Sequence, residues 1–347
     1  MGGNAFKEKT RRYSKEEYEL LYEEFINQGL RVLFPETPVE DIIFYRDKDS
    51  FGDMDILLVS DELPRDWLWQ ITEKFNIPEY IKNGNVYSLL YKDFQIDIIL
   101  TQHKYFLSSN VYFAYNDLGN LMGRMSHKMG IKYGHKGLSL VVRESQDHIL
   151  GEIELTNNPN IIFDILGLDA ETFRRGFDHK HAIFEYVASS PYFNPWIYDL
   201  DNRSHTSRTR DRKRQTYSEF LDWCEEIKDS LNHYPWPDMS EHGGYNLREP
   251  FYTDIVLKYW PEVEEKVNKL VYDYNISKQV KKIISAEIIM EITGLSGKDL
   301  GAFISIVRDG IFVNLGYSNE DVIEKIDEKA FRGMVEMIWY VNKDKFK

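Results

Sequence analysis

Two aspartates lie one residue apart where an apolar run begins, in the segment Gly52-Asp53-Met54-Asp55-Ile56-Leu57-Leu58. Because side chains alternate along a β-strand, the carboxylates of Asp53 and Asp55 are expected on the same face. A third aspartate, Asp97, stands between isoleucines in the apolar run Phe94–Leu100, where a carboxylate is costly unless it has a partner. Three carboxylates on two neighbouring strands would form a hard-oxygen site suited to Mg²⁺ or Mn²⁺. Two such ions support phosphoryl or nucleotidyl transfer.

Each of these aspartates also has an ordinary explanation. An Asp-x-Asp pair at the start of a strand is common in proteins that bind no metal. A lone Asp97 could instead cap a turn or pair with an arginine. Gly52 adds weight to the site, because a residue without a side chain lets another group approach the backbone at the mouth of the strand. The three acids and the glycine together favour a metal site.

The combination resembles the nucleotidyltransferase superfamily of DNA polymerase beta, and most closely its DNA polymerase X branch. Gly52-Asp53-Met54-Asp55 is similar to that branch's first palm motif, and Asp97 lies in a strand similar to the one with its third carboxylate. The resemblance covers roughly residues 40–167. It implies two metal ions, Mg²⁺ or Mn²⁺, that the first two aspartates both bind. Asp97 would bind the catalytic ion and help to deprotonate the attacking hydroxyl.

The same resemblance implies a set of nucleotide-binding residues. Arg46 occupies the position of the branch's phosphate-binding arginine, and Tyr112-Phe113 resembles the pair that packs beside the incoming sugar. Asn120 would contact the minor-groove edge of the incoming nucleotide, and Arg124 would reach the templating base or the primer terminus. The full implied set is Arg46, Ser50, Gly52, Tyr112, Phe113, Asn120 and Arg124.

Two positions depart from the pattern of the branch. Its triphosphate-gripping Gly-Ser falls at Ile42-Ile43 here, and Lys48 and Ser50 are the nearby residues that would compensate. Ala114-Tyr115 stands where the branch has Thr-Gly after its Tyr-Phe pair. The preference for one sugar over another is therefore open.

One short segment, Asn202–Arg214, holds a dense group of basic residues opposed only by Asp211. Such runs bind phosphates, and arginine makes bidentate contacts with them. A solvated loop that leads into the next helix explains the same residues equally well. If the protein acts on polynucleotide ends, we expect the strand backbone to be held by Arg203, Arg208, Arg210, Arg212, Lys213 and Arg214.

The apolar pattern predicts an α+β protein whose C-terminal region is mainly helical, and the resemblance makes its α+β part a polymerase beta-like nucleotidyltransferase palm. The first helix is expected to begin at a capping box of Ser14 and Glu17. The segment 233–250 is the candidate linker because it is rich in proline and glycine. We expect an N-terminal helix in residues 1–35, the palm with its nucleotide-sensing helix in 36–167, a helical and basic region in 168–240, and a C-terminal helical domain in 241–347.

A second and weaker similarity lies near the C-terminus. Residues 292–301 are similar to the tail helices of CCA-adding tRNA nucleotidyltransferases. An ordinary junction between two packed helices explains the same residues.

The composition excludes several classes of protein. The chain carries 43 Lys and Arg against 57 Asp and Glu, a net charge of −14, which argues against coating nucleic acid through bulk positive charge. Its apolar runs are shorter than the ~20 residues of a membrane span, so no membrane partner is expected. Cys224 is the single cysteine, which excludes an intramolecular disulfide and fits a reducing cytoplasm.

These observations predict a metal-dependent nucleotidyltransferase. It would add a nucleotide from a nucleoside or deoxynucleoside triphosphate to the 3′-hydroxyl of DNA or RNA. Template-independent addition to tRNA or other RNA, or to a small molecule, is the enzymatic alternative, since the same palm serves those reactions. A non-catalytic module that binds nucleotides or nucleic acid is the alternative of another class. The missing Gly-Ser supports that module, and the three intact acids count against it.

Overall fold

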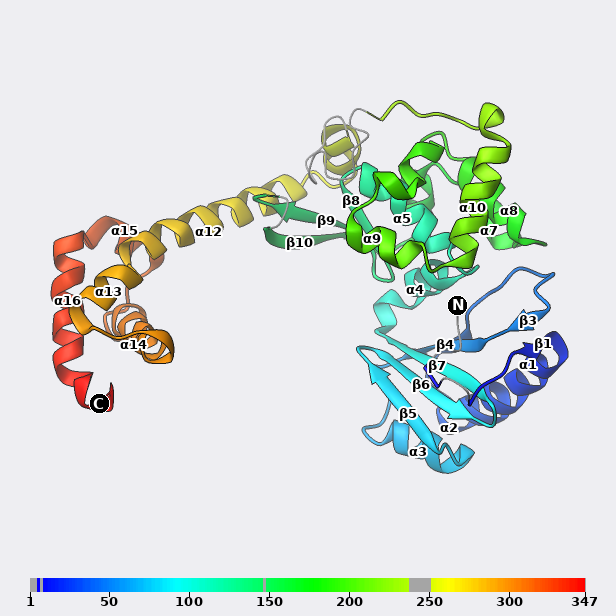
Figure 1. Ribbon diagram of the computed structural model, residues 1–347, viewed down its shortest axis with the longest axis horizontal. Helices are drawn as coiled ribbons and strands as arrows, with labels where there is room; N and C mark the ends of the chain where they lie inside the picture. The colour runs from blue at the N-terminus through cyan, green and yellow to red at the C-terminus, as the bar shows by residue number, and fades with distance from the viewer. Residues whose placement is uncertain (1–4, 7–8, 146–147, 237–250, 347) are drawn as a thin grey trace. The chain divides into compact units, whose positions relative to one another are not determined.

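The computed structural model divides the chain into two compact units, Met1–Pro261 and Glu262–Lys347 (Figure 1). The boundary expected between residues 240 and 241, and most of the linker expected at 233–250, lie outside the described part of the chain. The second compact unit begins at Glu262. The structure describes residues 5–6, 9–145, 148–236 and 251–346.

The first unit is built on a mixed five-stranded sheet with the order β2-β4-β7-β6-β5. Its central strands β4 and β7 run parallel, and the other neighbours are antiparallel. The chain therefore returns to the middle of the sheet after forming its edge, which confirms an α+β architecture. The strands are β2 (Val39–Asp41), β4 (Asp53–Val59), β5 (Glu79–Asn83), β6 (Val86–Tyr91) and β7 (Phe94–Thr101).

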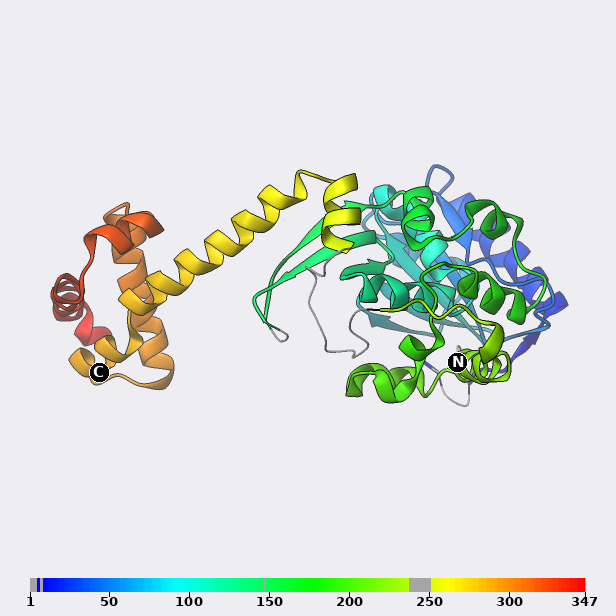
Figure 2. The same ribbon diagram turned by 90° about the horizontal axis from the view of Figure 1, so that it is seen from above.

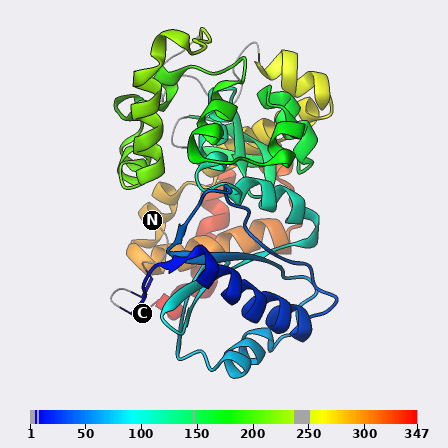
Figure 3. The same ribbon diagram turned by 90° about the vertical axis from the view of Figure 1, so that its right-hand side faces the viewer.

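The N-terminal helix covers one face of this sheet (Figure 3). Helix α1 (Lys15–Tyr22) begins at the predicted capping box, in which Ser14 and Glu17 each bond to the other's backbone. It continues through a π-helical segment, Glu23–Leu30, into α2 (Arg31–Leu33). Phe25 and Ile26 are fully buried against apolar side chains of the sheet and of α3 (Trp67–Phe75). This burial holds the strands that carry the aspartates in place.

The other face of the sheet carries α4 (Phe106–Phe113). Its Phe106 and Phe113 pack against Leu57 of β4 and Ile99 of β7. Helix α5 (Leu118–Lys128) follows, and then a three-stranded antiparallel sheet whose β9 and β10 form a long hairpin (Figure 2). The strands of that sheet are β8 (Ile131–Gly134), β9 (Gly137–Arg143) and β10 (Ile149–Thr156). A short pair, β1 (Tyr13–Ser14) with β3 (Ser50–Phe51), borders the first sheet.

The rest of the first unit is helical, as expected. Phe193, Tyr198 and Phe220 are fully buried in its core. The helices are α6 (Pro159–Leu166), α7 (Ala170–Arg175), α8 (Lys180–Ala188), α9 (His205–Asp211), α10 (Gln215–Glu226) and α11 (Leu257–Tyr259).

The second unit contains helices alone among its described residues. Phe303, Val307, Ile311 and Phe331 are fully buried at its centre. Gly294, at φ 70°, ends α13 in the left-handed conformation that glycine adopts readily. Its helices are α12 (Val263–Ile283), α13 (Ala286–Thr293), α14 (Gly297–Asp309), α15 (Asn319–Lys325) and α16 (Glu328–Asn342).

Within the described ranges, no single helix combines the length and the apolar composition that a membrane crossing requires. One bent pair, Gly297–Asn314 with Asn319–Lys325, meets both criteria jointly, with a bend of 97°.

Candidate functional site

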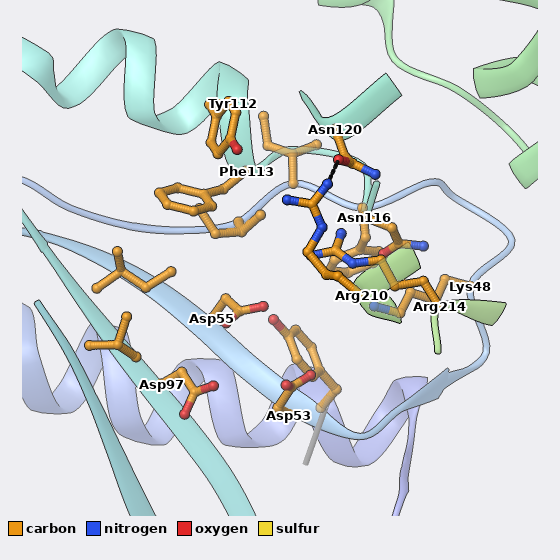
Figure 4. A pocket seen from close by; sticks show the side chains of 16 residues that line it. Lys48, Asp53, Asp55, Asp97, Tyr112, Phe113, Asn116, Asn120, Arg210 and Arg214 are labelled. Carbon is orange, nitrogen blue, oxygen red and sulfur yellow. Dashed lines mark hydrogen bonds between the residues drawn. The ribbon is translucent and has the colours of Figure 1, made fainter. Parts of the chain in front are cut away.

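The three predicted aspartates come together on adjacent strands. Because β4 and β7 are parallel, Asp55 pairs directly with Asp97, and Asp53 lies two residues earlier on the same face. One carboxylate oxygen from each of the three lies within 4.8 Å of the others. Figure 4 shows the three side chains on one side of a cavity. The prediction that Asp53 and Asp55 share a face is confirmed.

The electrostatics of this cluster are unfavourable for three bare carboxylates. Burial raises the pKa of Asp55 well above its ordinary value, and the charges of Asp53 and Asp97 raise it further. Burial also raises the pKa of Asp97, with a smaller contribution from Asp53. Like charges this close favour either a shared proton or a bound cation. Carboxylate oxygens are ligands that Mg²⁺ and Mn²⁺ prefer, so the donor set fits such a cation.

Asp97 has the partner that its apolar surroundings require, and this partner is an amide. Gln95, two residues earlier on β7, donates from Nε2 to both carboxylate oxygens of Asp97 at 2.9 Å. The backbone N–H of Ala5 donates to Oε1 of Gln95 at 2.9 Å, which fixes the orientation of the amide. Asp97 lies inside a strand, so it does not cap a turn. The N-terminal segment thus helps to orient the third carboxylate.

A tyrosine of the first helix also faces this site. Tyr18 of α1 is buried, stacks on Phe51 with 4.1 Å between ring centroids, and lines the cavity with the aspartates. Burial raises the pKa of its hydroxyl, and the charges of Asp41, Asp55 and Asp53 add to the increase. Its helical spacing signals only a buried face, so no feature of the sequence distinguishes it from a core residue.

The cavity around the aspartates has a volume of about 370 Å³. Tyr112, Phe113 and Asn120, three of the residues expected to contact a nucleotide, line it. Basic side chains form the side that faces the aspartates in Figure 4. These basic residues are Lys48, Arg210 and Arg214.

The turn between α4 and α5 holds two residues in the left-handed region, Tyr115 at φ 56° and Asn116 at φ 62°. Left-handed backbone is uncommon for residues with a side chain. Tyr115 is buried, packs edge-on against Phe177 and donates its backbone N–H to Ile43 at 2.8 Å. Asn116 lines the cavity. The residue that replaces the branch's glycine is therefore packed inside the protein, where it supports the turn.

Arg46 is not brought to the aspartates. Its Nη1 donates to Asp178 at 2.5 Å, and its Nη2 donates to the carbonyl of Arg175. It lines neither cavity at the aspartates. The basic residue of this loop that reaches the site is Lys48, whose Nζ lies 4.5 Å from the centre of the Phe51 ring. Burial lowers the pKa of Lys48, and Asp53 and Asp55 partly oppose this shift.

Arg124 is also held inside the protein. It is only 4% exposed, and its Nε donates to the carbonyl of Ile197 at 2.6 Å. It lines an adjoining cavity of about 210 Å³, which shares Asn120 and Arg210 with the aspartate cavity. Oδ1 of Asn120 accepts from Nη2 of Arg210 at 3.1 Å. The arginine expected at the templating base therefore lies behind Asn120.

The basic run divides into structural and cavity-lining residues. Nη2 of Arg203 lies 2.9 Å from Asp211, and both side chains are almost completely buried. Arg208 of α9 donates to the carbonyl of Arg203, so it too has a structural role at the start of that helix. Arg212 is exposed and lines neither cavity at the aspartates. The residues of the run that reach the site are Arg210, Lys213 and Arg214.

The two remaining predicted residues, Ser50 and Gly52, line a second cavity that borders the aspartates. Oγ of Ser50 accepts from Nε of Arg12 at 2.7 Å, and its carbonyl accepts from Nη2 of the same arginine at 2.7 Å. Ser50 thus anchors a basic side chain from the N-terminal segment at the edge of the site.

Comparison with protein-family models gives no match for this chain. The curated proteins likewise include none that matches it.

Proposed function

We propose that this protein is a metal-dependent nucleotidyltransferase of the DNA polymerase beta type. The observation that carries the proposal is the cluster of Asp53, Asp55 and Asp97, whose carboxylates lie within 4.8 Å of one another on two parallel strands. A cavity with aromatic and basic walls surrounds them. Carboxylates, aromatic rings and cations in one cavity suit a ligand that combines metal-bound phosphates with a sugar and a base.

The aspartates would hold two ions of Mg²⁺ or Mn²⁺. Asp53 and Asp55 would bind both ions, and Asp97 would bind one. Bound divalent ions lower the pKa of a hydroxyl and neutralise charge on transferring phosphates.

The residues of the chain supply the positioning and the route for the proton. A hydroxyl oxygen forms a bond to the α-phosphorus, and the bond from that phosphorus to the bridging oxygen breaks. Pyrophosphate leaves with the electron pair, and the hydroxyl's proton passes to the carboxylate of Asp97. Two features support Asp97 as the acceptor: Gln95 fixes the orientation of its carboxylate, and burial, more than offsetting the hydrogen bonds, raises its pKa above the ordinary value.

The acceptor that we propose is the 3′-hydroxyl of a DNA or RNA strand. Support comes from Tyr112 and Asn120 at the cavity, since both positions resemble those that contact the sugar and base in the DNA polymerase X branch. A tRNA, another RNA or a small-molecule hydroxyl would use the same aspartates, so only the acceptor differs between these alternatives.

The test is incorporation from labelled ribonucleotides and deoxynucleotides, with Mg²⁺ or Mn²⁺, on DNA and RNA ends with and without a template. We expect Asp97→Asn to lower incorporation by about 10²-fold or more, because the variant loses a metal ligand and the proton acceptor. Asp49→Asn is the matched control, since Asp49 is exposed and lies outside both cavities at the aspartates.

If Asp97→Asn incorporates nucleotides at the same rate as the wild type, the assignment of Asp97 as metal ligand and proton acceptor is contradicted. Triphosphate binding without metal or turnover, measured by calorimetry, would instead support the non-catalytic module.

A further inference from the structure

A second cavity, of about 650 Å³, borders the aspartates on the side of α9 and α10. Lys48 comes from the loop before β3, Arg12 from the N-terminal segment and Lys180 from α8. Segments that are distant in the sequence thus contribute positive charge to one concave surface. Its basic lining residues are Arg12, Lys48, Lys180, Arg210, Lys213 and Arg214.

The charge of this surface is not neutralised locally. Its six basic residues face three aspartates, Asp53, Asp55 and Asp117. Arg214 pairs with Asp117, and Lys180 pairs with Glu219 at 2.5 Å. Arg12, Lys48 and Lys213 form no ion pair with a carboxylate of the described residues. Three cations at the cavity are therefore available to an anionic ligand.

We propose that this surface, called the basic cradle below, binds the polyphosphate chain of a nucleoside triphosphate. The inference rests on the proposed function, and it says where the pyrophosphate leaving group of that reaction would be held. The cradle and the aspartate cavity share lining residues, so a phosphate chain that begins at the aspartates continues directly into the cradle. The shared residues are Lys48, Asp53, Asp55, Asn116, Arg210 and Arg214.

The cradle replaces the phosphate ligands that the resemblance implied. Isoleucines stand where the branch has its Gly-Ser, and Asp178 and a backbone carbonyl hold Arg46 away from both cavities. Lys48 is placed by its contact with the Phe51 ring, and Arg12 is placed by two bonds to Ser50. Cations that are anchored before the ligand arrives lose little conformational freedom on binding.

The arrangement favours a compact polyanion over an extended strand. A strand backbone carries single charges spread along a line, whereas a triphosphate concentrates several charges within a short distance. The cradle brings cations from four parts of the chain around one hollow, which suits concentrated charge. When the bond to the α-phosphorus breaks, the same cations stabilise the negative charge that develops on the departing pyrophosphate.

The direct test is the binding of inorganic tripolyphosphate, measured by isothermal titration calorimetry without metal and again with Mg²⁺. We expect Lys213→Ala to weaken binding by about five- to tenfold, as the loss of one charge-assisted contact does. Lys213 is exposed, so the substitution leaves the thermal unfolding temperature unchanged. Arg212→Ala is the matched control, because it removes the same charge from the same turn but from outside the cradle.

Equal losses of tripolyphosphate binding in Lys213→Ala and Arg212→Ala, or no loss in either, would overturn the cradle. The cradle is also overturned if Lys213→Ala binds tripolyphosphate as tightly as the wild type but binds single-stranded DNA more weakly. That result would place a strand on this surface. In the incorporation assay we expect Lys213→Ala to raise the KM for the triphosphate more than it lowers kcat. Selective tripolyphosphate binding without any incorporation would support the cradle while refuting the proposed reaction.

Discussion

Asp55→Asn should lower the rate of nucleotide incorporation by about 10³-fold or more, and it should make the metal-free protein more stable. The first effect follows from the loss of a ligand to both proposed ions. The second follows because Asp55 is half-buried beside Asp53 and Asp97, and both the loss of solvent and these like charges raise the free energy of its charged form. Most substitutions destabilise a protein, so a loss of activity together with a gain in stability is a specific signature of this site.

The way stability changes with pH tests the expected gain in stability of Asp55→Asn. The pKa of Asp55 is higher in the folded protein than in the unfolded chain, so the folded state binds more protons between those two values. The stability of the metal-free wild type should therefore fall as the pH rises through that window. Asp55→Asn should flatten this part of the profile. Mg²⁺ or Mn²⁺ should stabilise the wild type most at the alkaline end, where protons no longer compete, and should not stabilise the variant.

Asp41 supplies the control for this experiment. Burial raises its pKa to about 6, so Asp41→Asn should also reduce the loss of stability as the pH rises towards 6. Asp41 lines neither cavity, and its variant should keep both the stabilisation by metal and the incorporation. Thermal unfolding at a series of pH values, with chelator or with metal, measures each effect. Equal stabilisation of wild type and Asp55→Asn by the metal would contradict the metal site.

Asp211→Ala should destabilise the first unit by about 3–5 kcal/mol, which is the cost of leaving one member of a buried ion pair without its partner. Asp211 is fully buried, lies 2.9 Å from Arg203 and accepts from Nε of Arg210 at 2.9 Å. Arg203 would lose that carboxylate partner while its guanidinium stayed almost completely buried. The transition to follow is the chemical denaturation of the unit Met1–Pro261.

The double variant Arg203→Met with Asp211→Leu distinguishes a lost ion pair from a general packing defect. Replacing both charges with apolar side chains of similar volume is often nearly neutral, so we expect most of the lost stability to return. A loss below about 1 kcal/mol in Asp211→Ala would show that the pair does not stabilise α9, whose two ends it joins. If the double variant is as unstable as the single one, the charges are not the cause.

Local patterns of the sequence predicted a large part of the site. The alternation along residues 53–59 was sufficient to place Asp53 and Asp55 on one face, because the period of a strand does not depend on the rest of the fold. The capping box at Ser14 likewise marked the start of the first helix correctly. Asp97 could be recognised because a carboxylate among isoleucines needs a partner.

The partners of the charged residues could not be predicted in this way. Arg46 meets Asp178, which is 132 positions away, and Arg214 meets Asp117, which is 97 positions away. The amide of Gln95 holds Asp97 only because the chain from β7 and the N-terminal segment meet at that point. Such contacts depend on how distant segments pack, and a single sequence contains no local pattern that records them.

The sequence by itself determined the chemistry available at the centre of this protein: three carboxylates on two strands, with a glycine and aromatic residues beside them. Tertiary structure alone decided which positive charges face those carboxylates. It holds Arg46, Arg124 and Arg203 in structural contacts, and it brings Lys48 and Lys213 to one surface. The reason is physical, because backbone periodicity sets the direction of neighbouring side chains, whereas long-range packing sets which charges meet.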